Sequence, residues 1–301
     1  MRLDLHLIGI LYISQKVRYA QPKTVKYRYI ERIGGFHEME LNYIDIGCNL
    51  MGKQFKNDRD QVVEQSLADG VGLIITGTDP SSNRAAADYV ARSGREHLWY
   101  TCGMHPHNAD SWNRDRREEL VRLIVGEGAR AVALGEAGLD YDRMFSTREN
   151  QMHCFSDILD LAEEHGLPLF LHERSAEGDF QKLMKAHRSL CGRSVVHCFT
   201  GTKETAYRYL QLGCMIGITG WVCDHRRNRD VVEALKIIPL ERLMIETDAP
   251  YLTPLNVKGL SRRNVPSNIR YVADQIAKLK GVEPEEVRRR TLENTRAFFG
   301  L

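Results

Sequence analysis

The sequence lacks the features that would place it among membrane or disulfide-rich proteins. No run approaches the ~20 consecutive apolar residues that a membrane-spanning helix needs. Seven cysteines are scattered along the chain without one Cys-x-x-Cys pair, so neither a disulfide framework nor a thiolate zinc site is indicated. We expect buried, reduced thiols in a cytoplasmic protein.

A large excess of one charge is also missing. The formal net charge is +2, and charged residues make up 27% of the chain. This balance neither requires nor excludes nucleic acid as a partner, because a phosphate site needs only local positive charge. With 301 residues and 43% hydrophobic residues, the chain is long enough to bury a sizeable core.

The first 38 residues differ from the rest of the chain. They are rich in basic residues and show no clean hydrophobic period, and the apolar patch Leu5–Ile13 is not followed by a signal-peptidase pattern. Met39 stands immediately before the first regular segment. We therefore expect residues 1–38 to be an extension outside the folded domain, which would span 39–301. Mass spectrometry of natively expressed protein tests this; a mature N-terminus near residue 1 would contradict it.

From residue 43 onward, short apolar runs alternate with amphipathic stretches. This pattern predicts repeated strand–helix units and a parallel sheet. The eight predicted strands are Tyr43–Ile46, Val71–Thr78, Leu98–Gly103, Ala131–Gly135, Leu167–Leu171, Ser194–Val196, Cys214–Ile218 and Leu243–Ile245. Eight units in about 260 residues predict a (β/α)₈ TIM barrel of the α/β class.

Amphipathic segments between the strands predict helices with a spacing of three and four residues. The clearest predicted helices are 58–69, 116–125, 148–165, 268–279 and 285–298. Ser146 and Glu149 have the spacing of a capping box at the start of the third of these. Pro284 is expected in the first turn of the last helix, where a missing N–H costs little.

Imidazoles and carboxylates follow five of the eight predicted strands. They are His105 and His107 after the third, Glu136 after the fourth, His172 after the fifth, His197 after the sixth, and Asp248 after the eighth. Residues at the carboxyl ends of barrel strands converge on one rim. Each alone has an ordinary structural explanation, as a hydrogen-bonded strand end, a helix cap or a turn. Their agreement across five units favours a shared site for one or two divalent cations.

At these residues the chain resembles the TatD family of metal-dependent deoxyribonucleases. The matching motifs are Gly103-Met104-His105-Pro106-His107, Gly135-Glu136-Ala137-Gly138-Leu139-Asp140, Leu171-His172, Val196-His197-Cys198-Phe199-Thr200-Gly201, Gly217–Asp224, Ile245–Leu252 and Ser261-Arg262-Arg263-Asn264. The resemblance extends from about residue 43 to the C-terminus. It implies that Glu136, His172 and His197 are metal ligands. Asp248 would be a further ligand or the group that orients the attacking water, and His105 would lie near the scissile phosphate.

The resemblance also implies a substrate and a reaction. It implies a monomeric 3′-5′ exonuclease that cleaves phosphodiester bonds of single-stranded DNA or RNA, with a role in DNA repair. The sequence adds basic candidates for phosphate contacts, Arg174, Arg262 and Arg263, since arginine is suited to bidentate phosphate binding. His107 would orient the substrate. Trp221 and Tyr251 would stack on unpaired bases or pack in the core.

One motif departs from the wider family. Many members carry Asp-x-His-x-His on the first strand, where this chain has Gly47 and Asn49 after Asp45. Loss of two nitrogen ligands should weaken one metal position and favour Mg²⁺ over Mn²⁺ or Zn²⁺. Two other activities stay open: hydrolysis of an ester, lactone or amide bond by the same site, and nucleic-acid binding without catalysis.

Overall fold

The computed structural model describes residues 41–126 and 128–301, so the expected extension 1–38 lies outside the described residues. Eight parallel strands follow one another around the sheet in chain order. They are β1 (Tyr43–Cys48), β2 (Val71–Ile75), β3 (Leu98–Cys102), β4 (Ala131–Asp140), β5 (Leu169–Arg174), β6 (Ser194–Val196), β7 (Met215–Ile218) and β8 (Leu243–Ile245). A parallel bridge joins Cys48 at the end of β1 to Ala249, four residues beyond β8, and so brings the two ends of the sheet together. The predicted (β/α)₈ barrel is confirmed.

Both faces of the sheet are buried. One face contacts an apolar layer inside the barrel, and the other contacts an apolar layer between the strands and the helices. Ile74 and Phe170 point into the barrel and belong to an inner cluster with Ile46, Val195 and Met244. Their neighbours along the strands belong to an outer cluster shared with the helices. Side chains alternate along a strand with a period of two, which explains why the strands read as continuous apolar runs.

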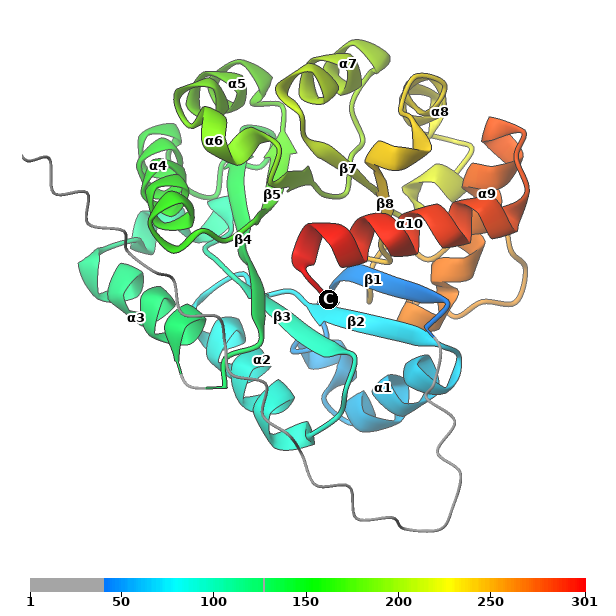
Figure 1. Cartoon of the computed structure of the whole chain (residues 1–301), viewed down its shortest axis with the longest axis horizontal. Coiled ribbons are helices and arrows are strands. Elements are labelled where there is room, and N and C mark those ends of the chain that lie inside the picture. Colours follow the sequence, from blue (N-terminus) through cyan, green and yellow to red (C-terminus); the bar gives the residue numbers. More distant parts are fainter. Residues whose placement is uncertain (1–40, 127) are drawn as a thin grey trace, which may run out of the picture. The chain divides into compact units, whose positions relative to one another are not determined.

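Helices surround the strands (Figure 1). They are α1 (Arg59–Ala68), α2 (Pro80–Ser93), α3 (Arg114–Val125), α4 (Arg148–His165), α5 (Glu177–Ala186), α6 (Arg188–Cys191), α7 (Lys203–Leu212), α8 (Arg229–Leu235), α9 (Ile269–Lys280) and α10 (Pro284–Phe299). Helix α10 crosses one end of the barrel, where Leu292 and Phe299 join the inner cluster. Pro284 occupies the first turn of α10, as expected. This arrangement leaves the opposite mouth, at the carboxyl ends of the strands, for a site.

Three strands extend beyond their predicted ends, and the first of them, β1, does so by two residues, to Cys48. Strand β4 continues through Glu136 to Asp140, and β5 continues through His172 to Arg174. These extensions pair with each other, with Gly138 beside His172. Gly138 permits this close approach, since its φ is +139° and a Cβ there would overlap the carbonyl oxygen of His172. Glu136 and His172 therefore lie within strands, which fixes their backbones more firmly than loops would.

The cap of α4 also differs from the prediction. Thr147 is the N-cap, and its hydroxyl accepts a hydrogen bond from the backbone N–H of Asn150. Ser146 is buried instead, where its hydroxyl donates to the carbonyl oxygen of His107. The N-cap predicted at Ser146 is therefore wrong by one residue, and the predicted capping box with Glu149 is not formed, because Ser146 instead ties the loop after β4 to the loop after β3.

Two expectations about composition can be compared with the structure. All seven cysteines are free; six are buried and Cys198 is partly exposed. Within the described ranges, no helix combines the length and the apolar character that a bilayer crossing requires.

Candidate metal centre

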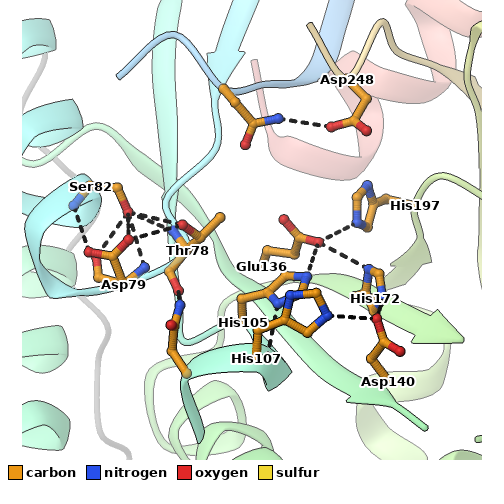
Figure 2. Close-up of polar contacts among 12 residues, drawn as sticks. Thr78, Asp79, Ser82, His105, His107, Glu136, Asp140, His172, His197 and Asp248 are labelled. Atoms are coloured by element: carbon orange, nitrogen blue, oxygen red, sulfur yellow. Dashed lines mark hydrogen bonds and ion pairs between the residues drawn. The ribbon is translucent and has the colours of Figure 1, made fainter. Parts of the chain in front are cut away.

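Glu136 lies at the middle of the barrel mouth and is contacted by three imidazoles. Its Oε1 atom is 2.8 Å from Nε2 of His197, 3.1 Å from Nε2 of His105 and 3.1 Å from Nδ1 of His172. The three rings come from the ends of β3, β5 and β6, and Figure 2 shows them arranged around the one carboxylate. Residues separated by up to 92 positions thus meet at one oxygen atom, as the sequence predicted.

Asp140 holds two of the imidazoles from the side. Its Oδ2 atom is 2.8 Å from Nε2 of His107 and 3.3 Å from Nε2 of His172. Backbone N–H groups of Asp142 and Arg143 donate to its other oxygen. A carboxylate behind an imidazole fixes the orientation of the ring and makes its other nitrogen a better ligand. Asp140 can therefore orient His172 toward the centre.

Glu246 has the corresponding position behind His197. Its side chain is fully buried, and its Oε2 atom lies 3.4 Å from Nδ1 of His197. Its other oxygen accepts the backbone N–H of Cys198. The space that it occupies exists because positions 47 and 217 are glycines: a Cβ on Gly47 would lie 2.5 Å from Oε2, and one on Gly217 would lie 3.0 Å from Oε1.

Asp248 faces the cluster from the other side of the mouth (Figure 2). Its Oδ1 atom accepts a 2.8 Å hydrogen bond from the side-chain amide of Asn49. The backbone is fixed as well, because the N–H of Asp248 donates to the carbonyl oxygen of Gly47 at 2.9 Å. One carboxylate oxygen of Asp248 is thus held in place, and no hydrogen bond to the other is found among the described residues.

The proximity of these groups shifts their pKa values. Burial raises the pKa of Glu136, but His105 and His197 outweigh it and hold that pKa well below its usual range. Burial alone would lower the pKa of His197, whereas Glu136 and Glu246 raise it well above the ordinary value. For Asp248, burial raises the pKa to about 7. The centre therefore favours an ionised Glu136.

The donor set fits a divalent cation. For Glu136 and Glu246 both to accept from His197, that imidazole must carry protons on both nitrogens. In the chain as described, neither glutamate forms an ion pair with lysine or arginine, so their charge has only imidazole partners. Imidazole nitrogen combined with carboxylate oxygen suits Zn²⁺, Mn²⁺ and related ions, and carboxylate-rich sites suit Mg²⁺. Ligand atoms of His105, Glu136 and His172 lie within 4.8 Å of one another, close enough to share one ion.

Most of the predicted site residues border one cavity of about 680 Å³ at this mouth. Those that border it are His105, His107, Glu136, His172, Arg174, His197 and Asp248. Ligand pockets in proteins usually have volumes of about 300–1,000 Å³, so the cavity is large enough for a substrate. Trp221 and Tyr251 also border it, and 52% of the surface of Tyr251 is exposed.

The three predicted arginines lie in different surroundings. Arg174 borders the cavity, with its Nε 3.2 Å from Asp142. Arg262 borders a neighbouring groove. Arg263 makes a bidentate ion pair with Asp58, at 2.8 and 2.6 Å, and its guanidinium lies 4.9 Å from the ring centroid of Phe55. Of the three, Arg263 is thus the one most fully engaged with the protein itself.

Sequence reasoning did not assign roles to Asp140, Glu246 or Asn49. Asp140 and Glu246 stand in motifs that the sequence does single out, after Glu136 and before Asp248, but nothing in the spacing shows that they face His172 and His197. From the sequence, Asn49 only marks a position where many family members have a histidine. Its hydrogen bond to Asp248 depends on closure of the barrel between β1 and β8.

A barrel with carboxylates and imidazoles gathered at the carboxyl ends of its strands defines a metal-dependent hydrolase. Comparison with known proteins identifies the family. The family model described as TatD related DNase matches residues 44–300. The 3′-5′ ssDNA/RNA exonuclease TatD of Erwinia amylovora is 41% identical over 260 residues, which cover 85% of this chain and 99% of that protein. The chain therefore belongs to the TatD-related DNase family, and the predicted class of phosphodiester hydrolase is confirmed.

Other relatives agree in sequence and in fold. The enzyme of the same name from Pectobacterium atrosepticum is 42% identical over 260 residues, covering 85% of this chain and 99% of its own. A hydrolase of the TatD family from Entamoeba histolytica has a crystal structure that superposes with a TM-score of 0.79 at 28% identity, covering 86% of this chain and 98% of that one.

Proposed function

We propose that this protein is a divalent-metal-dependent exonuclease that removes nucleotides from the 3′ end of single-stranded DNA and RNA. The observation that carries the proposal is the convergence of three imidazoles on one oxygen of Glu136 at the mouth of a large cavity. The bacterial relatives, which match over nearly their whole length, are named 3′-5′ ssDNA/RNA exonucleases, and this supports the polarity and the substrate.

In this proposal Glu136, His172 and His197 hold the cation, and His105 completes the group or contacts the scissile phosphate. A bound divalent ion would lower the pKa of a water molecule and stabilise charge on phosphate oxygens. Asp248 orients the attacking water with the oxygen that Asn49 leaves free. His107, held by Asp140, and Arg174 bind the substrate on the opposite wall. Mg²⁺ is the proposed ion, with Mn²⁺ and Zn²⁺ as alternatives.

Further parts of the proposal concern the setting of the protein. The free, mostly buried thiols are consistent with a reducing compartment, and we propose the cytoplasm. We also propose that the protein acts as a monomer and takes part in DNA repair, as the family resemblance implies.

The test uses single-stranded DNA and RNA labelled at the 5′ end, with Mg²⁺, Mn²⁺ or a chelator. We expect a ladder that shortens from the 3′ end with either ion and no cleavage with chelator. Glu136→Ala and His197→Ala should remove cleavage. Glu163→Ala is the matched control, because that carboxylate belongs to an exposed group with Asp160 and His187 on the outside of the barrel.

Three results would redirect the proposal. Turnover of an ester, a lactone or an amide, with inert nucleic acid, would favour the rival hydrolase. Binding of single strands by the wild-type protein without cleavage would favour a binding module. Cleavage that persists in Glu136→Ala would exclude this site as the catalytic centre.

A further inference from the structure

A second groove begins where the main cavity ends. It has a volume of about 260 Å³ and is formed by the segment after β7 and the loop after β8. Leu252 borders both hollows, and the adjacent residues Gly220 and Trp221 border the groove and the cavity respectively. A Cβ on Gly220 would overlap the carbonyl oxygen of Leu252, so the two segments touch at this point. The groove is thus a direct continuation of the candidate metal centre.

The charge of this groove suits a polyanion. Arg262 is exposed, and its guanidinium has no hydrogen-bond or ion-pair partner among the residues that the structure describes. Asp224, the one acidic residue that lines the groove in the described ranges 41–126 and 128–301, is paired with both Arg226 and Arg227. Arg227 and Arg262 border the groove against the one aspartate, and Arg226 adds a further positive charge beside Asp224, so the groove is positive. A guanidinium without a partner can take a phosphate in a charge-assisted, bidentate contact.

The wall between the two hollows offers an aromatic surface. The guanidinium of Arg227 lies 3.9 Å from the ring centroid of Trp221, which keeps that indole in place. Trp221 borders the cavity directly next to Gly220 of the groove, whereas the exposed Tyr251 borders the cavity and the hollow on the side of Asn49. Aromatic rings of this kind stack on unpaired bases regardless of sequence.

Another hollow also adjoins the main cavity, on the side of Asn49 and Thr78, and is the natural rival path. It is bordered by Asp79, Ser81 and Ser82 at the start of α2, and none of the described residues that line it is a lysine or an arginine. The side chain of Asp79 already accepts the N–H groups of both serines. A phosphate there would meet the negative charge of Asp79, which has no cationic partner among the described residues, and N–H groups that are already in use, whereas the groove at Arg262 presents positive charge.

We propose that the groove between Gly220 and Arg262 binds the sugar-phosphate backbone of the strand that stays attached after cleavage. Arg262 contacts the phosphate next to the scissile one on the 5′ side, and Arg227 lies beside it. The inference rests on the proposed exonuclease function and adds a path for the substrate. It assigns Arg262 to the retained strand and separates it from the chemistry at Glu136.

The experiment compares a dinucleoside monophosphate, whose one phosphate is the scissile one, with a decanucleotide of the same base. The wild type should have a higher kcat/KM for the decamer. In Arg262→Ala the ratio of the two kcat/KM values should fall about tenfold, mainly through KM for the decamer, as expected for one lost charge-assisted contact. Arg262→Glu should lower it further. Because charge on the substrate backbone is involved, the salt dependence of decamer binding should weaken by roughly 0.7 in the log–log slope.

Arg188→Ala is the matched control. Arg188 is exposed and forms no ion pair within the part of the chain that the structure describes, but it precedes β6 and so lies at the other end of the barrel. The Arg188→Ala substitution removes the same charge as Arg262→Ala and should leave the ratio of the two kcat/KM values unchanged. Decamer binding in the presence of chelator, followed by fluorescence anisotropy, reports on the groove independently of catalysis and should weaken only in the Arg262 variants.

The inference is overturned if the wild type does not prefer the decamer, if the ratio is unchanged in both Arg262 variants, or if Arg188→Ala lowers it equally. Failure of the proposed function has a different signature, since then neither substrate is cleaved by the wild type with any ion. Equal melting temperatures for wild type and Arg262→Ala verify that the variant is folded.

Discussion

Replacement of Gly47 by alanine is the sharpest test of how the metal centre is built. An added Cβ would lie 2.5 Å from Oε2 of Glu246 and 2.8 Å from Cζ of Phe170. Ordinary contacts are closer to 3.5–4.0 Å, so both neighbours must move. Phe170 is fully buried inside the barrel, and Glu246 is fully buried behind His197. Neither can move into solvent.

The expected cost follows from this crowding. Inserting one methyl group into a packed interior destabilises a protein by about 1–3 kcal/mol. For a domain of this size, that corresponds to a fall in the melting temperature of about 2–4 °C per kcal/mol. Glu246 would also be displaced from His197, and disturbing a partner behind a metal ligand typically lowers metal affinity about 10–100-fold. Stability and cation binding should therefore fall together.

The assay combines thermal unfolding in chelator with titration of Mn²⁺ by calorimetry. Gly178→Ala is the control substitution. Gly178 lies in the first turn of α5, its backbone has no positive φ, and nothing lies within 4 Å of the added Cβ. Alanine at that helical position should leave stability unchanged or raise it by about 0.5–1 kcal/mol.

A melting temperature of Gly47→Ala equal to that of the wild type would refute this reasoning. A second variant separates the two contacts. Glu246→Ala removes the oxygen that the new methyl group meets, so the double variant should be less unstable than the sum of the single effects. Coupling of about 0.5–3 kcal/mol is typical of residues in contact. Simple additivity would show that Glu246 does not occupy the space above Gly47.

Three further predictions concern the site and the core. Glu136→Gln should abolish Mn²⁺ binding measured by calorimetry without lowering the melting temperature of the metal-free protein by more than a few degrees; retained binding would contradict the ligand assignment. Saturating Mn²⁺ should stabilise the wild type by about 2.7 kcal/mol at 100 times its Kd, and chelator should reverse the shift in thermal unfolding; a melting temperature independent of Mn²⁺ would argue against the site. Tyr209→Phe removes the buried hydroxyl that donates to Glu173, so urea unfolding should show a loss of about 1–3 kcal/mol. Tyr207→Phe, at an exposed position of the same helix, should have no effect, and equal losses would contradict the role of that hydrogen bond.

The barrel could be predicted because its signal is periodic. Eight apolar runs alternate with helical stretches, and each observed strand overlaps its predicted segment. The largest error concerns β4, predicted to end at Gly135 but continuing to Asp140. Glycines and acidic residues normally mark the end of a strand. Here Gly138 permits close contact with β5, and that depends on a pairing partner more than 30 positions away, which local sequence does not reveal.

The sequence predicts which residues gather at the candidate site, but it does not predict which carboxylates orient the imidazoles there. Barrel topology alone brings Glu136, His172 and His197 to one rim, and no further information is needed for that step. The carboxylates behind the imidazoles are different. Whether Asp140 faces His172 or solvent depends on the extension of β4 and on side-chain direction, and these appear only once the strands are paired.

The structure shows what Gly47 and Asn49, the two residues that replace histidines at the end of β1, contact in the folded chain. The sequence presents Gly47 and Asn49 as the loss of two nitrogen ligands. In the structure both positions direct carboxylates from the end of β8: Gly47 leaves the space that Glu246 fills, and Asn49 holds one oxygen of Asp248. The two histidine nitrogens of other family members are thus absent here, and carboxylate oxygens of Glu246 and Asp248 lie in the same region. A centre richer in carboxylate oxygen favours harder cations. The absence of the two histidines and the placement of the two acidic residues therefore support the same choice of Mg²⁺, and they do so through one packing relation between β1 and β8.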